Sequence, residues 1–356
     1  MKRCVMFFGL LFCSILFAFG QTEYFFRDIA YGNGRFVVVA SSSDWEPPSG
    51  RIAHSADGIN WTAVTANTGF SDQRINSITY GGGRFVAVGG GGRIATSTDG
   101  ISWLAVTNSP FGNDERISRV AYGNGRFVAV SGGWSWSIPL TGRIAHSADG
   151  INWTLATNSP LFDQGIGVLY LDGIRSFIAW GWTSAARGAR TVWEHSSDGI
   201  NWTPLPRPDG LLGANTSVTG ITHGNGRFVA IVRDHVNEQS TTVVSTDGIN
   251  WLPQTNVPSI VHPWEGLHGI VFGGGNFVAF GGAFEASTAW GIRLHSSDGI
   301  NWTGISDGFG VGTDSLISSI VYGGGRFVAF GGGGRIAIST DGIDWTIVTT
   351  APDVFR

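Results

Sequence analysis

The sequence predicts an all-β protein, a β-propeller of seven four-stranded antiparallel blades. Three observations carry this prediction: a segment that returns seven times, short strand-like runs between glycine-rich turns, and no helical periodicity. The repeated segment has the pattern Ser-x-Asp-Gly-x-x-Trp, and we call each copy a box segment. The copies are Ser55–Trp61, Ser97–Trp103, Ser147–Trp153, Ser196–Trp202, Ser245–Trp251, Ser296–Trp302 and Ser339–Trp345. Their tryptophans lie 42 to 51 residues apart, a spacing typical of solenoids, propellers and arrays.

The first twenty residues have the pattern of a secretory signal peptide. Lys2 and Arg3 precede the apolar run 4–19, and Ala18 and Gly20 supply small residues before a cleavage position. The run is short for a membrane span, and no later stretch is apolar for long enough to cross a bilayer. We therefore expect residues 1–20 to be removed and residues 21–356 to be secreted, either outside the cell or into the periplasm.

The composition of the mature chain excludes several classes of function. Both cysteines lie in the leader, so no disulfide and no thiol ligand remains. Without Lys2 and Arg3 the chain has 20 basic and 26 acidic residues, a net charge of −6. A mildly acidic chain with no arginine-rich run fits poorly to a phosphate backbone, so nucleic acid is not an expected partner. We also expect no cofactor and no metal, because neither a phosphate loop nor a metal-ligand cluster is found.

Each repeat unit reads as four short strands. The first ends in an aromatic residue before a Gly-Gly or Asn-Gly turn, which is the strongest short hairpin signal. The second, such as Arg84–Val88, is apolar on both faces, as in a sheet covered on two sides. The third leads into the box segment, and the fourth starts at its tryptophan. The blades then span approximately 23–70, 71–112, 113–160, 161–211, 212–260, 261–311 and 312–356.

The box segment resembles the Asp-box of the BNR, or sialidase-like, repeat β-propeller family. The motif also occurs in sortilin-like and photosystem-assembly-factor-like proteins, so the resemblance implies the fold and leaves the function open. A structural role is expected, in which the aspartate accepts backbone N–H bonds, the glycine permits a positive φ and the tryptophan is buried between blades. The aspartates with this expected role are Asp57, Asp99, Asp149, Asp198, Asp247, Asp298 and Asp341.

Function is expected at one end of the propeller. The loops between second and third strands, and the links between blades, differ in every unit and share one face, here called the variable-loop face. The eight tryptophans outside the box segments fall in or beside these loops: Trp45, Trp134, Trp136, Trp180, Trp182, Trp193, Trp264 and Trp290. They stack on sugar rings or anchor a protein partner, or several of them fold back as plugs. The candidate ligand contacts are Trp134, Trp136, Trp182, Trp264 and Trp290.

Four acidic residues share a position eight residues before the first-strand aromatic. They are Glu23, Asp72, Asp114 and Asp314. If the first strands surround a centre, these acids form an arc at its mouth that suits a cation or a basic ligand group. The alternative, which we favour, is that they pair with neighbours such as Arg74 and Arg116 or cap the linking turns.

The repeated histidines and arginines are interpreted as structural. The histidines stand before the box serine and are replaced in other units by Thr96, Val244 and Ile338, an exchange that indicates packing rather than metal binding. They are His54, His146, His195 and His295. The arginines adjoin the uniform turns, away from the variable-loop face: Arg35, Arg84, Arg126, Arg227 and Arg326.

The residues disfavour a sialidase mechanism. The family resemblance implies a tyrosine nucleophile, yet five of the six tyrosines stand at the uniform-turn end and only Tyr24 could reach the other face. We therefore predict a secreted or envelope-associated, monomeric, non-catalytic propeller that recognises a protein or glycan through its variable-loop face, with no catalytic residues. The alternative is a glycan-acting hydrolase, such as a sialidase or another glycosidase, on the same scaffold.

Overall fold

A computed structural model provides the structure of the protein. It describes residues 24–42, 47–132, 142–157, 162–183, 191–205, 216–234, 236–237, 239–248, 250–254, 266–285, 288–305 and 316–348. The signal-peptide prediction therefore concerns residues outside the described ones.

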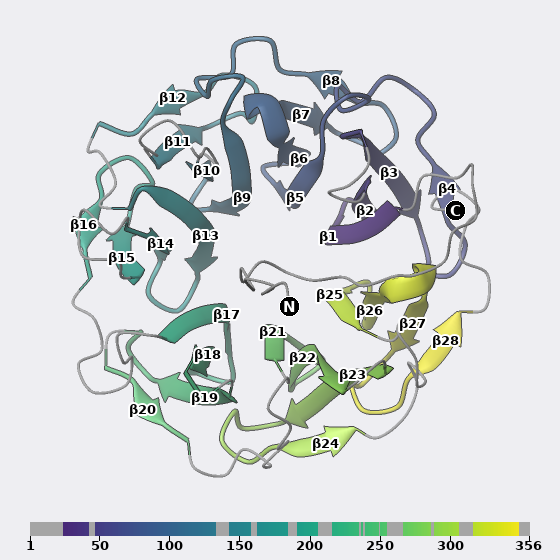
Figure 1. Ribbon diagram of the computed structural model, residues 1–356, viewed down its shortest axis with the longest axis vertical. Helices are drawn as coiled ribbons and strands as arrows, with labels where there is room; N and C mark the ends of the chain where they lie inside the picture. Colours follow the sequence, from purple (N-terminus) through teal and green to yellow (C-terminus); the bar gives the residue numbers. More distant parts are fainter. Residues whose placement is uncertain are drawn as a thin grey trace, which may run out of the picture.

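The described chain forms 28 β-strands, which pair in order as antiparallel runs of four; we call each run a unit (Figure 1). The first strands are β1 (Tyr24–Gly32), β5 (Ile75–Gly81), β9 (Arg116–Gly123), β13 (Gln164–Leu171), β17 (Thr216–Gly224), β21 (Gly266–Gly273) and β25 (Ile317–Gly323). The second strands are β2 (Arg35–Ser42), β6 (Arg84–Gly89), β10 (Arg126–Gly132), β14 (Ser176–Trp182), β18 (Arg227–Asp234), β22 (Asn276–Glu285) and β26 (Arg326–Gly331). The third strands are β3 (Gly50–Ser55), β7 (Ile94–Ser97), β11 (Arg143–Ser147), β15 (Thr191–Ser196), β19 (Gln239–Ser245), β23 (Thr288–Ser296) and β27 (Ile336–Ser339). The fourth strands are β4 (Thr62–Ala63), β8 (Leu104–Ala105), β12 (Thr154–Leu155), β16 (Thr203–Pro204), β20 (Leu252–Pro253), β24 (Thr303–Ile305) and β28 (Thr346–Val348).

The units form five separate four-stranded sheets and one eight-stranded sheet. The larger sheet joins β9–β12 to β13–β16 through a single residue pair, Gly132 with Gln164. The first strands stand around the middle of a ring, and the fourth strands lie at its periphery (Figure 1). Two short 3-10 turns, η1 (Gly90–Gly92) and η3 (Gly332–Gly334), are the only helical elements among the described residues. The all-β prediction is confirmed.

The core lies between neighbouring units, because the second strands are apolar on both faces. In β2, Val38 packs with Val328 and Phe330 of the unit β25–β28, whereas Val37 packs with Phe85 of the unit β5–β8. All of these side chains are at most 1% exposed. Each sheet is therefore covered on two sides, as the unbroken apolar runs predicted.

The first and last units meet by packing. Gly32 at the end of β1 touches the next unit so closely that an added Cβ would lie 2.0 Å from the Tyr80 ring. The same contact closes the ring, since a Cβ on Gly323 would lie 2.1 Å from the Tyr31 ring. Arg326 also donates to the carbonyl of Asp57 at 3.0 Å. The sheets β1–β4 and β25–β28 are each built from consecutive strands, so closure involves no exchanged strand among the described residues.

The box segments are turns held by their own side chains. In the first, the N–H groups of Ile59 and Asn60 each donate to Oδ1 of Asp57 at 2.8 Å, and Ser55 Oγ donates to the same oxygen. Gly58 has φ of 75°, a conformation that favours glycine. Burial opposes ionisation of Asp57, but the N–H donors of Asn60 and Ile59 outweigh it and hold its pKa well below the usual range. The turn therefore depends on a charged aspartate.

Candidate recognition surface

The described part of the variable-loop face omits much of the predicted site. Trp134, Trp136, Trp264, Glu23 and Asp314 lie outside the described residues. Trp290 is placed by its backbone alone, which pairs with Ala283 in the β22–β23 ladder. Trp182 ends β14, pairs with Gln164 and Thr191, and is half-buried. The structure brings none of these tryptophans together among the residues it describes.

Two of the loop-flanking tryptophans are core residues. Trp180 and Trp193 are 7% and 6% exposed, and their rings stack with centroids 6.0 Å apart. Both pack in the cluster between the units β13–β16 and β17–β20, with Phe228 and Val243. For this pair the plug interpretation is correct, and the alternative of ligand contact is wrong.

Two described acids at the rim, Asp72 and Glu115, form ion pairs within the rim. Asp72 forms a bidentate ion pair with Arg93. Nη1 and Nη2 of Arg93 lie 2.5 and 2.8 Å from Oδ1 and Oδ2 of Asp72. The partner is therefore the arginine before the third strand rather than Arg74. Asp114 is exposed, and in its unit Glu115 makes the corresponding contact, 3.3 Å from Nε of Arg143. Asp72 is thus paired, whereas the predicted arc of four acids stays a prediction, because Glu23 and Asp314 lie outside the described residues.

Every first strand carries one extra residue, a β-bulge, near the variable-loop face. The ladder register shifts at the same place in all of them. The extra residues are Arg27, Asn76, Ser118, Ile166, Thr219, His268 and Ser318. A bulge disrupts the ladder locally and re-aims the following side chain. The bulges therefore decide which side chains reach the middle of the ring.

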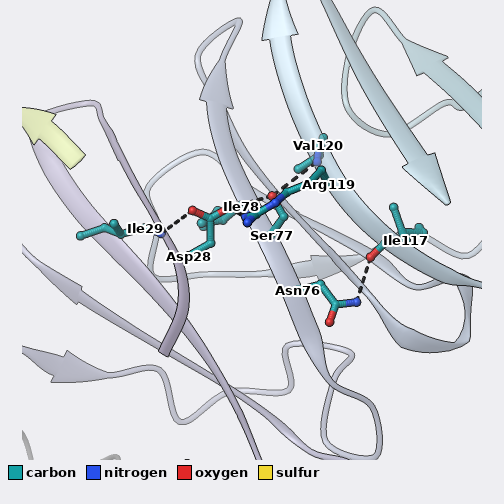
Figure 2. A network of polar contacts seen from close by, with 8 residues as sticks. All are labelled: Asp28, Ile29, Asn76, Ser77, Ile78, Ile117, Arg119 and Val120. Carbon is teal, nitrogen blue, oxygen red and sulfur yellow. Dashed lines mark hydrogen bonds and ion pairs between the residues drawn. The ribbon is translucent and has the colours of Figure 1, made fainter. Parts of the chain in front are cut away.

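The residues after the first three bulges form a polar network across β1, β5 and β9 (Figure 2). Oδ2 of Asp28 accepts bonds from Ser77 Oγ at 2.8 Å, from Ile78 N at 3.1 Å and from Arg119 Nη1 at 3.2 Å. Its Oδ1 accepts from Ile29 N at 2.9 Å. The Asp28 side chain is 17% exposed and that of Arg119 is 46% exposed. One mostly buried carboxylate thus links three units.

The bulge residues themselves connect neighbouring first strands. Asn76 Nδ2 donates to the carbonyl of Ile117 at 2.8 Å, beneath the Asp28 network in Figure 2. Across the ring, Thr219 Oγ1 donates to the carbonyl of Leu267 at 2.9 Å. Ile117 and Leu267 each precede the bulge of the next unit, so the two bonds are equivalent. Such bonds satisfy backbone groups that the inner edge of a sheet leaves unpaired.

Glycines replace the network in the other half of the ring. Gly167, Gly220 and Gly269 follow the bulges of β13, β17 and β21. An added Cβ would lie 2.1 Å from the Trp180 ring at Gly167 and 3.0 Å from the Gly269 backbone at Gly220. Large second-strand aromatics and close backbone packing therefore require these glycines. Of the described residues that follow the bulges, the charged ones are Asp28 on β1 and Arg119 on β9.

A histidine with a shifted pKa stands in the glycine half. His268 is the half-buried bulge residue of β21, and burial, with a smaller effect of Arg233, lowers its pKa to about 4. Both side chains crowd Gly266, where an added Cβ would lie 2.8 Å from Arg233 Nη1 and 3.3 Å from His268 Nε2. The imidazole is therefore neutral at neutral pH. Sequence reasoning missed His268 and the Asp28 network. Asp28, Ser77 and Arg119 share the position after the bulge, whereas His268 is a bulge residue.

Tyr24 is engaged in structural contacts. Its hydroxyl shares a hydrogen bond with Ser49 Oγ at 2.9 Å, and the Arg51 guanidinium lies 5.1 Å from its ring centroid. No grouping of three or more His, Cys, Asp or Glu suited to a metal occurs in the described chain. Within the same residues, no helix has the length and apolar character needed to span a membrane.

Comparisons with known proteins identify the fold. No protein-family model and no curated protein matches the chain. A structure of YCF48 bound to D1 peptide is 18% identical over 87% of this chain and 91% of that one, with a TM-score of 0.57. The β-propeller domain of the Trilobed protease from Pyrococcus furiosus, described as having an open velcro topology, is 9% identical. The match covers 94% of this chain and 98% of that domain, with a TM-score of 0.56. An acylaminoacyl peptidase from Pyrococcus horikoshii is 10% identical over 93% of this chain and 53% of the peptidase chain, with a TM-score of 0.57. At these identities the likeness shows the fold alone, and the chain is a β-propeller.

Proposed function

We propose that the protein is a seven-bladed propeller that recognises a polypeptide through its variable-loop face. The observation that carries this proposal is the division between the two ends of the ring. One end repeats the same box turns in every unit, whereas the other combines a polar centre with an exposed charged rim. Residues that differ from unit to unit and are held by a rigid scaffold are typical of a binding surface.

The seven-blade interpretation follows from the strand pairings. The eight-stranded sheet contains two complete units that touch through one residue pair, so we count it as two neighbouring blades. The contacts of Tyr31 with Gly323 and of Arg326 with Asp57 then close the ring between blades seven and one. The Asp-box assignment is part of this proposal, supported by the shared turn geometry of the box segments.

A polypeptide ligand is favoured over a glycan by the charge of the described rim. Arg116 and Arg119 are exposed beside Asp114, and the Asp72–Arg93 pair lies on the neighbouring unit. Alternating charges of both signs suit a polypeptide, which carries both, better than a neutral sugar surface. The similar fold of YCF48, solved with a bound peptide, supports the same choice.

We infer binding rather than catalysis from the state of the central carboxylate. Both oxygens of Asp28 are occupied by donors, four in all. A nucleophile or general base needs an available lone pair directed at the substrate. Asp28 therefore positions the strands of the surface. We also propose that residues 1–20 are cleaved and that the protein acts outside the cytoplasm.

Peptide and glycan arrays probed with the mature protein test the proposed function. We expect captured peptides whose binding weakens at least tenfold, about 1.4 kcal/mol, in the variant Arg116→Gln. The matched control is Asp344→Asn, an exposed charge on a box turn at the other end, which should leave binding unchanged. Equal loss in both variants, or turnover of a glycan in place of binding, would reject the proposal.

A further inference from the structure

In every described unit except β13–β16, whose second strand opens with Ser176, the residue that opens the second strand makes one of two contacts at the uniform-turn end. It is an arginine in most units and Asn276 in the unit β21–β24. One kind of contact stays within the unit and reaches the residue before the box serine. The other crosses to the next unit and reaches the backbone carbonyl of its box aspartate. The same position in the fold therefore has two acceptors within reach.

The contact within the unit occurs in three units, β1–β4, β5–β8 and β9–β12. Arg35 Nη1 lies 3.0 Å from Nδ1 of His54, and Arg126 Nη1 lies 3.1 Å from Nδ1 of His146. In the unit between them, Arg84 Nη1 donates to Thr96 Oγ1 at 3.4 Å. Each third-strand residue supplies a side-chain acceptor.

The contact with the next unit is made by three other units, β17–β20, β21–β24 and β25–β28. Arg227 donates to the carbonyl of Asp298 at 2.6 Å, and Arg326 donates to that of Asp57 at 3.0 Å. In these two units the third-strand position holds Val244 or Ile338, which have no acceptor. Asn276 donates to the carbonyl of Asp341 at 2.9 Å. Where the arginine has no acceptor on its own unit, it uses the neighbouring box carbonyl.

The arginines of the first group already reach the neighbouring box. An added Cβ on Gly100 would lie 3.2 Å from Cδ of Arg35, and one on Gly199 would lie 3.1 Å from Cδ of Arg126. Gly100 and Gly199 directly follow Asp99 and Asp198. The aliphatic stem thus crosses the boundary in both kinds of contact, and only the guanidinium must turn to change from one to the other.

The imidazoles accept only while they are neutral. A guanidinium has donors and no acceptor, so the Nδ1 that faces it must carry a lone pair. The charged groups facing His54 are Arg35 and, from the next unit, Asp99; those facing His146 are Arg126 and Asp198. Burial, then the arginine, lowers the pKa of each histidine, and the aspartate opposes this in part. Protonation would place two cations in contact.

We propose that His54 and His146 are proton-sensitive switches at two boundaries of the propeller. When the imidazole takes up a proton, its arginine turns to the carbonyl of Asp99 or Asp198 in the next unit, the contact that Arg326 and Arg227 make permanently. Acid thereby replaces a bond within a unit by a bond between units. The box turn at each of these boundaries then carries one more donor.

Crystal structures of the wild type at a pH above the ordinary histidine pKa of about 6.5, and at a pH far enough below it to protonate histidines whose pKa is lowered, test the switch directly. We expect Arg35 and Arg126 on the histidines at high pH and on the box carbonyls at low pH. The internal control is Arg84, whose partner Thr96 does not titrate and whose contact should stay the same. Arginines that remain beside the histidines, or turn to solvent, at low pH overturn the proposal.

The variant His54→Val gives the second test, since it copies the unit that carries Val244. Arg35 should then contact the Asp99 carbonyl at both pH values, while Arg126 still responds to acid. An Arg35 that stays away from Asp99 in this variant contradicts the proposal. Independently of any effect of that variant on folding, an NMR titration of Arg35→Gln should show a higher His54 pKa than in the wild type. An unchanged His54 pKa would show that the charge of Arg35 does not act on the imidazole, which contradicts the proposal.

Discussion

Replacing Asp28 by alanine should destabilise the propeller far more than a typical change near its surface. The substitution removes the acceptor of four hydrogen bonds. Two of the donors belong to Ser77 and Ile78, which are 1% and 4% exposed and have no room to turn to water. Leaving a buried donor without an acceptor costs about 1–3 kcal/mol.

The expected loss in free energy of unfolding is about 3 kcal/mol. Most of it comes from the two buried donors, because the Arg119 side chain is 46% exposed and its ion pair contributes at most about 1 kcal/mol. Asp28→Asn keeps the shape and one carbonyl oxygen, so it should lose about half as much. Asp114→Asn, at an exposed position in the next-but-one unit, should stay within about 0.5 kcal/mol of the wild type.

Urea unfolding followed by tryptophan fluorescence measures these differences, with the slope checked for two-state behaviour. Hydrogen exchange at the Ile78 amide supplies a local reading, and its protection should fall in Asp28→Ala. An alanine variant as stable as Asp114→Asn would refute the account of a carboxylate that links three units.

Four further outcomes are expected. Trp153→Ala, at an 8% exposed box tryptophan, should cost about 3–5 kcal/mol in urea unfolding, whereas Asp149→Ala should cost about 1 kcal/mol; equal effects near zero would contradict burial between units. The lowered pKa values of His54 and His146 mean that the unfolded chain binds more protons, so stability should fall as the pH drops below about 6.5, and His54→Val should flatten this slope. The Asp99 pKa of about 2 predicts that its turn keeps its contribution above the ordinary aspartate pKa of about 3.8 and loses it only as the pH falls toward 2, which amide exchange at Ile101 would show. Trp134→Ala with Trp136→Ala should leave the melting temperature nearly unchanged and weaken ligand capture at least tenfold, about 1.4 kcal/mol; a variant that unfolds would place both residues in the core.

The fold could be predicted from the sequence because its signals are local and repeated. A turn that needs a positive φ, such as that at Gly58, selects glycine wherever it occurs, and unbroken apolar runs require cover on both faces. The strand order within each unit followed from those two signals. The interior position of Trp180 and Trp193 did not, because adjacency to a loop does not show on which side of a strand a ring points.

The polar centre was hidden for a different physical reason. A β-bulge shifts the register by one residue without a fixed composition, so Arg27, Asn76 and Ser118 give no common signal. The partners of Asp28 on the other units lie 49 to 91 residues away in the chain, a distance over which no local pattern acts. Likewise, the two acceptors of Arg35 and Arg326 become visible only when neighbouring units are placed side by side.

Hydrogen exchange of the mature protein with and without an array-selected peptide tests recognition at the variable-loop face most directly. The account predicts added protection around the starts of β5 and β9 and the turn before β7, where Arg74, Arg116 and Arg93 stand, and unchanged exchange in the box turns at Asp57, Asp149 and Asp298. Protection confined to the box turns, with none at the strand starts, would contradict it.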